Sequence, residues 1–243
     1  MGKRISFAEK LMLQPHDLFA AVGGGGKTSL LRKVGQELLE QGQKVLLTTT
    51  TQIMEPEQFP GPVFLRDGEE PEAYIRRVAD CREQAVLTGE YLEKTKKKIK
   101  GAEDDLTDLL YAGIPDRIFL CEADGTAGHS FKIFRPHEPV IPKAATRLVF
   151  VAGADAWQQP CGEVLFRCPE NLSRRVFDKE FWQAELGRSL GRIRKMYSGE
   201  IDLLINKAEA ERRDAALEMA AAARPMAERI WICSLQEGWL ELV

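Results

Sequence analysis

The stretch Ala21-Val-Gly-Gly-Gly-Gly-Lys-Thr28 has the composition of a phosphate-binding loop. Glycine lets backbone N–H groups approach a phosphate closely and adopts positive φ without strain, and the positive end of a following helix favours the anion. We expect Lys27 to reach the outer phosphates and the Thr28 hydroxyl to bind Mg²⁺. The full pattern has glycine in place of Ala21, which is also small. The predicted nucleotide-binding residues of this loop are Gly23, Gly24, Gly25, Gly26, Lys27, Thr28 and Ser29.

Two carboxylates stand two residues apart at the end of the apolar run Ile118–Ala123: Glu122 lies within the run and Asp124 directly follows it. A phosphate loop requires acidic groups at a neighbouring strand end to hold Mg²⁺ and the attacking water. Gly125–Gly128 then resembles a switch loop that senses the γ-phosphate. The alternative is a strand that ends in an ordinary polar turn. The predicted catalytic residues are Lys27, Glu122 and Asp124, and the predicted metal ligands are Thr28, Glu122 and Asp124.

Two further strand ends carry polar residues, at Thr48–Thr51 and at Asn206-Lys-Ala-Glu209. The threonine hydroxyls either hold the metal or a phosphate oxygen, or simply reflect β propensity. In many GTP-binding proteins an Asn-Lys-x-Asp loop in this place recognises guanine through its acidic residue. Here Glu209 is one methylene longer than that aspartate. We expect Asn206, Lys207 and Glu209 to flank the base; the alternative is an N-cap turn that begins the next helix.

The loop His137-Glu-Pro-Val-Ile-Pro142 is stiffened by its prolines and follows the predicted switch loop. The histidine spacing gives no metal-ligand geometry, so we interpret the loop as a surface that shapes a substrate or partner site. The candidate residues for this role are Thr50, Lys132, His137, Glu138 and Asp155. The lysine run Lys94–Lys100 is interpreted as a solvated face, with a phosphate-facing loop ending at Gly101 as the alternative.

These residues need a scaffold of alternating strands and helices. Apolar runs predict strands at Leu18–Val22, Val45–Thr51, Val63–Leu65, Ala85–Thr88, Ile118–Ala123, Leu148–Ala152, Leu203–Asn206 and Ile230–Ser234. Helical spacing predicts helices at Lys27–Gln41, Glu69–Asp80, Glu103–Ala112, Leu172–Met196 and Ala208–Ala223. The alternation predicts a P-loop NTPase-like α/β fold, a mostly parallel sheet with helices on both faces. The arginine-rich segment Phe166–Gly199 interrupts it and predicts a helical insertion or lid, at about 166–199, on a single domain spanning 1–243.

Composition excludes several classes of protein. The chain has 243 residues and a formal net charge of −3, which argues against a general nucleic-acid-binding protein. No run of about 18 apolar residues is present, as a membrane helix would need, and the charged N-terminal stretch is no secretory signal. The five cysteines form no CxxC pair and indicate reduced thiols. We therefore expect a cytoplasmic protein with no membrane or nucleic-acid partner.

The order of these motifs resembles the YqeC family, described as selenium-dependent hydroxylase accessory or selenium-cofactor biosynthesis proteins. The resemblance spans residues 18 to 210 and rests on VGGGGKTSL, KVLLTTTTQI, KIKG, EADGTAG, HEPVIP, VAGADA with Asp155, and INKAE. The chain departs from the family at Glu209, where aspartate is usual, and at Phe166, where a basic residue or histidine is usual. The resemblance implies a P-loop NTPase-like fold and a role in the maturation of molybdenum- and selenium-containing hydroxylases.

The residues favour a Mg²⁺-dependent nucleoside triphosphatase that uses ATP or GTP, and the resemblance implies a molybdenum hydroxylase or its cofactor precursor as partner. One alternative is a small-molecule kinase, in which the arginine-rich helix closes over the phosphates as a lid. The other is a non-catalytic, nucleotide-gated chaperone that docks through the HEPVIP loop and the lysine run. Product analysis separates the kinase from the triphosphatase, and phosphate release with and without a partner separates the chaperone.

Overall fold

The computed structural model describes residues 5–54, 62–91, 98–101 and 105–243. Its contacts divide the chain into two compact units, each described here by itself. Unit 1 comprises Met1–Ala21, Leu31–Gly125 and Val140–Arg147, and unit 2 comprises Val22–Leu30, Thr126–Pro139 and Leu148–Val243. The chain thus passes from unit 1 to unit 2 just before the glycine loop and returns within the helix that follows it.

Unit 1 contains a mostly parallel sheet. Its central strands β1 (Leu18–Gly23), β7 (Ile118–Glu122), β2 (Val45–Thr49) and β5 (Ala85–Tyr91) are parallel and adjacent in that order. Strand β4 (Pro62–Leu65) is parallel to β5, whereas β6 (Lys98–Lys100) and β3 (Ile53–Met54) add antiparallel pairings. Every residue of β1, β2 and β7 is buried, as expected of parallel strands covered on both faces.

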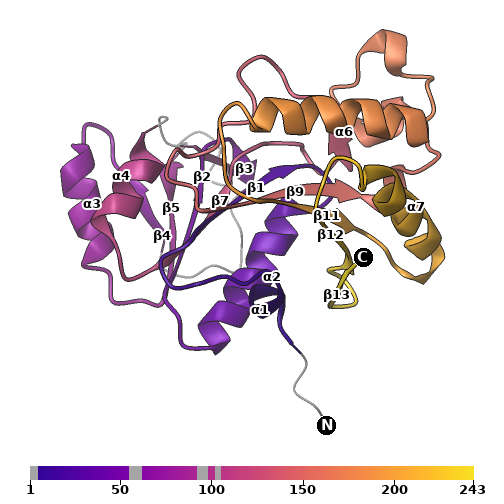
Figure 1. Cartoon of the computed structure of the whole chain (residues 1–243). Helices are drawn as coiled ribbons and strands as arrows, with labels where there is room; N and C mark the ends of the chain where they lie inside the picture. Colours follow the sequence, from indigo (N-terminus) through magenta and orange to yellow (C-terminus); the bar gives the residue numbers. More distant parts are fainter. Residues whose placement is uncertain (1–4, 55–61, 92–97, 102–104) are drawn as a thin grey trace. The chain divides into compact units, whose positions relative to one another are not determined.

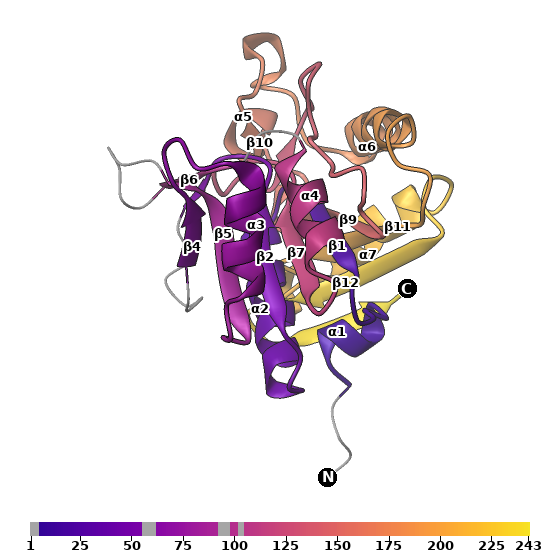
Figure 2. The same ribbon diagram turned by 90° about the vertical axis from the view of Figure 1, so that its left-hand side faces the viewer.

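Short helices accompany this sheet in unit 1 (Figure 1). They are α1 (Phe7–Lys10), most of α2 (Lys27–Glu40), α3 (Pro71–Ala79) and α4 (Leu106–Gly113). Helices α3 and α4 lie side by side in both views (Figure 2). The buried Tyr74 of α3 ties the helix to the sheet, because its hydroxyl donates to the Val63 carbonyl at 2.8 Å and accepts from the Gly89 N–H at 3.2 Å. Helix α2 ends at Glu40, and the chain turns away at Gly42, whose φ of +78° suits glycine.

Unit 2 contains the parallel strands β9 (Arg147–Gly153), β11 (Ile201–Asn206) and β12 (Arg229–Ser234), and β13 (Trp239–Leu242) pairs antiparallel with β12. A two-stranded parallel sheet joins β8 (Phe131–Lys132) to β10 (Leu165–Phe166). The helices are α5 (Cys161–Val164), α6 (Lys179–Ile193) and α7 (Arg213–Ala223). The predicted α/β class, with a mostly parallel sheet, is confirmed.

The core of unit 2 is aromatic. The ring of Phe131 in β8 meets the rings of Phe150, Phe177 and Trp182 at centroid distances of 5.9, 5.3 and 5.5 Å. Trp182 of α6 also donates its indole N–H to the Met219 carbonyl of α7 at 2.9 Å. These rings anchor β8, and therefore also fix the segment just before it, which contacts the glycine loop.

Element boundaries differ from the prediction mainly around the last two helices. Helix α6 begins at Lys179 rather than at Leu172, since Asp178 accepts a hydrogen bond from the Phe181 N–H at 2.9 Å and caps the helix. Helix α7 begins at Arg213, after a 3₁₀ turn at Ala210–Arg212. The helical part of the predicted insertion is thus shorter than its sequence suggests.

Candidate functional site

The glycine loop between β1 and α2 has a backbone that other residues cannot adopt. Gly23, Gly25 and Gly26 have φ values of +89°, +71° and +120°. A Cβ on Gly23 would lie 2.3 Å from the Val151 carbonyl oxygen, and a Cβ on Gly25 would lie 2.3 Å from the Gly153 nitrogen. Glycine is therefore required both for the dihedral angles and for the close approach of β9.

Backbone and side-chain hydrogen bonds hold this loop in place from several directions. The Gly24 N–H donates to the Val151 carbonyl at 2.8 Å, and the Gly25 N–H donates to the His129 carbonyl at 2.9 Å. The Asn206 side-chain amide donates to the Gly25 carbonyl at 2.7 Å. The loop is consequently positioned by the ends of two strands and by the segment that precedes β8.

Lys27, the first residue of α2, is 2% exposed. Its ammonium donates to the Gly23 carbonyl at 2.5 Å and to the Thr126 hydroxyl at 3.1 Å. The side chain thus curls back over the loop at the helix N-terminus, where the helix dipole favours an anion. Thr28 is half-buried and Ser29 is exposed on the first turn of the same helix.

The predicted carboxylates belong to unit 1. Glu122 ends β7 in register with Ala21 of β1 and Thr49 of β2, and it is 5% exposed. Asp124, two residues further along, is 2% exposed. Burying a carboxylate is costly unless it is compensated by polar partners or serves a function. The end of β7 therefore carries two buried acidic side chains.

The threonines at the end of β2 form local contacts in unit 1. The Thr49 hydroxyl donates to the Glu122 carbonyl at 2.8 Å, and the Thr50 hydroxyl donates to the Val140 carbonyl at 2.6 Å. Gly101 packs directly on this turn, because a Cβ there would lie 2.1 Å from the Thr50 carbonyl carbon. Of the lysine run that precedes Gly101, residues 94–97 lie outside the described part of the chain.

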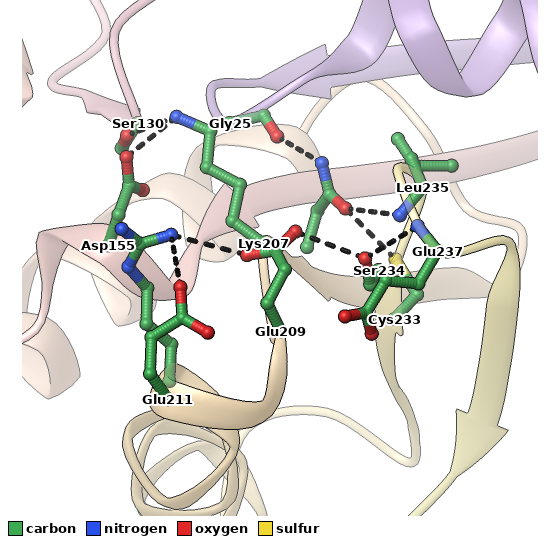
Figure 3. A network of polar contacts seen from close by, with 12 residues as sticks. Gly25, Ser130, Asp155, Lys207, Glu209, Glu211, Cys233, Ser234, Leu235 and Glu237 are labelled. Carbon is green, nitrogen blue, oxygen red and sulfur yellow. Dashed lines mark hydrogen bonds and ion pairs between the residues drawn. The ribbon is translucent and has the colours of Figure 1, made fainter.

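The predicted base-recognition residues begin at the end of β11 in unit 2, and Figure 3 shows Lys207 and Glu209 among their polar contacts. Besides its bond to Gly25, Asn206 accepts from the Leu235 N–H at 3.1 Å through its side-chain oxygen. Glu209 accepts from the Ser234 hydroxyl at 3.0 Å, and its second oxygen pairs with Arg212 at 3.2 Å. Asn206 therefore joins the turn after β12 to the glycine loop.

Lys207 has a left-handed backbone, with φ at +62°, a conformation that costs a non-glycine residue of order 1–3 kcal/mol. Its ammonium pairs with the Asp155 carboxylate at 2.7 Å and donates to the Ser130 hydroxyl at 2.9 Å. The structure thus brings Lys207 together with Asp155, which the sequence assigned to a different, substrate or partner, surface.

The loop after β8 centres on an ion pair within unit 2. The Lys132 ammonium, whose side chain is 1% exposed, lies 3.0 Å from a Glu138 carboxylate oxygen. Burial alone would raise the pKa of Glu138, but the Arg135 N–H and the Lys132 ammonium together hold it below its usual value. The rings of Phe134 and Phe166 lie 5.7 and 5.6 Å from this ammonium. His137, which was grouped with these residues, is exposed.

The cysteines are all free thiols. Burial raises the pKa of Cys121, beside Glu122, and the nearby Glu122 carboxylate raises it further. The thiolate is the reactive form of cysteine, so Cys121 is held in its inert form. Among the described residues, no group of three His, Cys, Asp or Glu side chains is arranged to hold a metal ion. None of the described helices combines the length and the apolar character that crossing a bilayer requires.

Thr126 and Ser130 accept hydrogen bonds from Lys27 and Lys207, but neither residue was predicted as a site residue from the sequence. Thr126 was noted only as part of the predicted switch loop, and Ser130 was not noted at all. Thr126 could have been predicted from the sequence, because it closely follows the candidate site residues Glu122 and Asp124. No local pattern marks Ser130, because its hydroxyl meets Lys207 across 77 residues of sequence.

Comparison with protein-family models covers the glycine loop and the acidic strand end. A family model described as YqeC protein matches residues 19–169, more than half of the chain. A curated relative, "Uncharacterized protein YqeC" from Escherichia coli (strain K12), is 32% identical over 136 residues, which are 56% of this chain and 51% of the relative. The chain therefore spans about half the length of this relative. The family match includes Asp155 and ends before the Asn206 loop.

Proposed function

The chain belongs to the YqeC family, and from its glycine loop we propose that it binds a nucleoside triphosphate with Mg²⁺ and hydrolyses it. Lys27 carries this proposal. A buried ammonium, curled over four glycines at the start of a helix and bonded to the Gly23 carbonyl and the Thr126 hydroxyl, lies where phosphate oxygens would replace those two neutral acceptors. An ammonium attracts an anionic phosphate oxygen more strongly than a neutral carbonyl or hydroxyl oxygen, so the exchange favours the ligand.

The donor types of the predicted metal residues fit Mg²⁺. Magnesium prefers hydroxyl and carboxylate oxygens, and on a nucleotide it keeps several waters and needs only one or two protein ligands. On the sequence pattern, Thr28 would supply the hydroxyl ligand and Glu122 or Asp124 the carboxylate ligand. When bound, the ion would neutralise charge on the outer phosphates.

The remaining steps fall to the chain's own residues. Backbone N–H groups at the start of α2 and the Lys27 ammonium bind and orient the phosphates. The second carboxylate of the β7 end orients the attacking water, and Thr126 responds to the γ-phosphate through its bond to Lys27. Asn206, Lys207 and Glu209 flank the base of ATP or GTP. Phosphoryl transfer requires mainly positioning and charge stabilisation, which this set supplies.

We further propose that hydrolysis serves the maturation of selenium-dependent molybdenum hydroxylases. The support for this role is the motif order shared with the YqeC family. The partner would be such a hydroxylase or its cofactor precursor, with the loop around Lys132 and Glu138 as the contact surface. Phosphate release measured with and without an apo-hydroxylase tests this part separately from nucleotide binding.

The test of the core proposal compares Lys27→Ala with Lys33→Ala. Lys33 lies on the same helix, half-exposed, and pairs only with Glu37 among the ion pairs described. We expect ATP or GTP with Mg²⁺ to raise the melting temperature of the wild type and of the Lys33 variant, because a ligand that binds only the native state stabilises it by about 2.7 kcal/mol at 100 times its Kd. The Lys27 variant should lose this shift and lose phosphate release.

Persistent hydrolysis in Lys27→Ala would remove the glycine loop as the site. Transfer of phosphate to an acceptor, without inorganic phosphate release, would instead make the protein a kinase.

A further inference from the structure

We infer that Asp155 and Ser130 are positioning residues, which hold the Lys207 side chain as a wall for the ring of a nucleoside. This inference rests on the proposed nucleotide binding and goes beyond it, because it assigns a role to two residues outside the phosphate loop and specifies the part of the ligand that they serve.

The first observation is that the Lys207 ammonium is already paired with other side chains of unit 2. Its ammonium lies 2.7 Å from one Asp155 oxygen and 2.9 Å from the Ser130 hydroxyl. The other Asp155 oxygen is buried and has no hydrogen-bond partner among the described residues, so Lys207 is the partner found for this carboxylate. An ammonium engaged in this way offers little charge to a phosphate. What remains for a ligand is the four-carbon stem, which is apolar.

The second observation is that both anchors lie on backbone that packs against the glycine loop. A Cβ on Gly24 would lie 2.8 Å from the Ser130 carbonyl carbon, and one on Gly25 would lie 2.3 Å from the nitrogen of Gly153, two residues before Asp155. The backbone of Lys207 directly follows Asn206, whose side-chain amide donates to the Gly25 carbonyl at 2.7 Å. Lys207 therefore spans from one attachment of the loop to the other (Figure 3).

The third observation is the left-handed backbone of Lys207, with φ at +62°. Strain of this kind persists where the surroundings determine it, and it is concentrated at functional sites. In this conformation the side chain is directed across to Ser130 and Asp155 rather than along the following turn. A merely solvated lysine would need neither the strained backbone nor two anchors.

An apolar stem fixed beside a phosphate loop suits a flat aromatic ring that is attached to the phosphates. Nucleotides have such a ring, whereas inorganic polyphosphates do not. The structure thus points to a nucleotide, rather than a polyphosphate or a simple phosphate ester, as the ligand class.

The test is titration calorimetry of the full chain with Mg²⁺ and three ligands: ATP, GTP and tripolyphosphate, which has the phosphates without the nucleoside. We expect Asp155→Asn and Lys207→Ala each to weaken the preferred nucleotide about tenfold, a change of about 1.4 kcal/mol, and to change tripolyphosphate binding less than about twofold. The double variant should bind no more weakly than Lys207→Ala, because both changes act through one side chain. Glu241→Gln is the matched control, since it breaks another ion pair of unit 2, with Arg213 at 2.6 Å, and should leave both ligands unaffected.

Equal weakening of nucleotide and tripolyphosphate in Asp155→Asn, or no weakening of either, overturns the inference. In that case the proposed function still holds if the wild type binds nucleotide and Lys27→Ala does not. A wild type that binds none of the three ligands overturns both. If Asp155→Asn fails to fold, Ser130→Ala removes the other anchor and must show the same selective loss of nucleotide affinity; a Ser130 variant with unchanged selectivity also overturns the inference.

Discussion

The requirement for glycine at position 25 can be separated into its two causes by comparison with Gly238. Both residues are in unit 2 and have nearly the same φ, +71° for Gly25 and +73° for Gly238. A Cβ on Gly238 has no atom within 4 Å, whereas a Cβ on Gly25 would lie 2.3 Å from the Gly153 nitrogen and 2.5 Å from the Ala152 carbonyl carbon. Alanine at either position therefore adopts the same unfavourable φ, but only at position 25 does its Cβ also clash with main-chain atoms.

The magnitudes follow from these two terms. Left-handed backbone costs an alanine about 1–2 kcal/mol, so Gly238→Ala should lose about that much free energy of unfolding. Gly25→Ala should lose the same amount plus about 1–3 kcal/mol for overpacking, because the contacts are with main chain that cannot rotate away. Its total loss is therefore about 2–5 kcal/mol.

Urea unfolding followed by far-UV circular dichroism measures both variants, with the slope of free energy against urea expected to stay constant. Equal losses in the two variants, within about 0.5 kcal/mol, would show that β9 does not confine the loop and would refute the packing argument. Because the loop must also move to accept a Cβ, Gly25→Ala should lose the thermal shift produced by Mg²⁺ and nucleotide, and Gly238→Ala should keep it.

Other outcomes follow from the same geometry. Asn206→Ala removes a hydrogen bond to the buried Gly25 carbonyl and another from the half-buried Leu235 N–H, and it should cost about 2–4 kcal/mol in urea unfolding; a loss below about 0.5 kcal/mol would contradict it. Glu138→Gln should destabilise the protein at pH 7, and since the Glu138 pKa is depressed beside Lys132, the difference from wild type should vanish as the pH falls below 4.5. A difference that persists in acid would be the contrary result. Iodoacetamide at pH 8 should label half-buried Cys168 before Cys121, whose pKa is raised by complete burial; mass spectrometry of the native protein would show the reverse order if this were wrong.

Much of the fold could be predicted from the sequence where local signals agree with tertiary structure. The helix predicted to begin at Lys27 does so and ends at Glu40, one residue before the expected position. The buried parallel strands were visible as apolar runs, because such strands need no polar face. The strand predicted at Ile118–Ala123 is β7, which begins at Ile118 and ends one residue early, at Glu122.

Elements that depend on pairing rather than on their own composition were missed. Lys98–Lys100 was interpreted as part of a solvated run, yet it forms strand β6, which pairs antiparallel with both β5 and β3. Trp239–Leu242 pairs antiparallel with β12 after a turn at Gly238, a glycine signal that was overlooked. The late start of α6 had a local cause as well, the cap at Asp178.

The site shows the same division between local and long-range information. Lys27 and the glycines before it could be singled out from the sequence because they form one contiguous segment. The contact of Asp155 and Ser130 with Lys207 could not, since the three residues come from separate segments and meet only through the packing of unit 2. Long-range contacts of this kind leave no periodic signal in the sequence.

The glycine loop also has a consequence for the order of events during synthesis. Residues 23–26 emerge from the ribosome early, but the groups that hold them come much later: His129 and Val151 first, and Asn206 last, 181 residues after Gly25. Translation adds about 5–20 residues per second, so the loop spends roughly 10–40 seconds without its final hydrogen bond. A nascent chain that has not reached Asn206 cannot make this last hydrogen bond, so the glycine loop is finished only when strand β11 of unit 2 has been made.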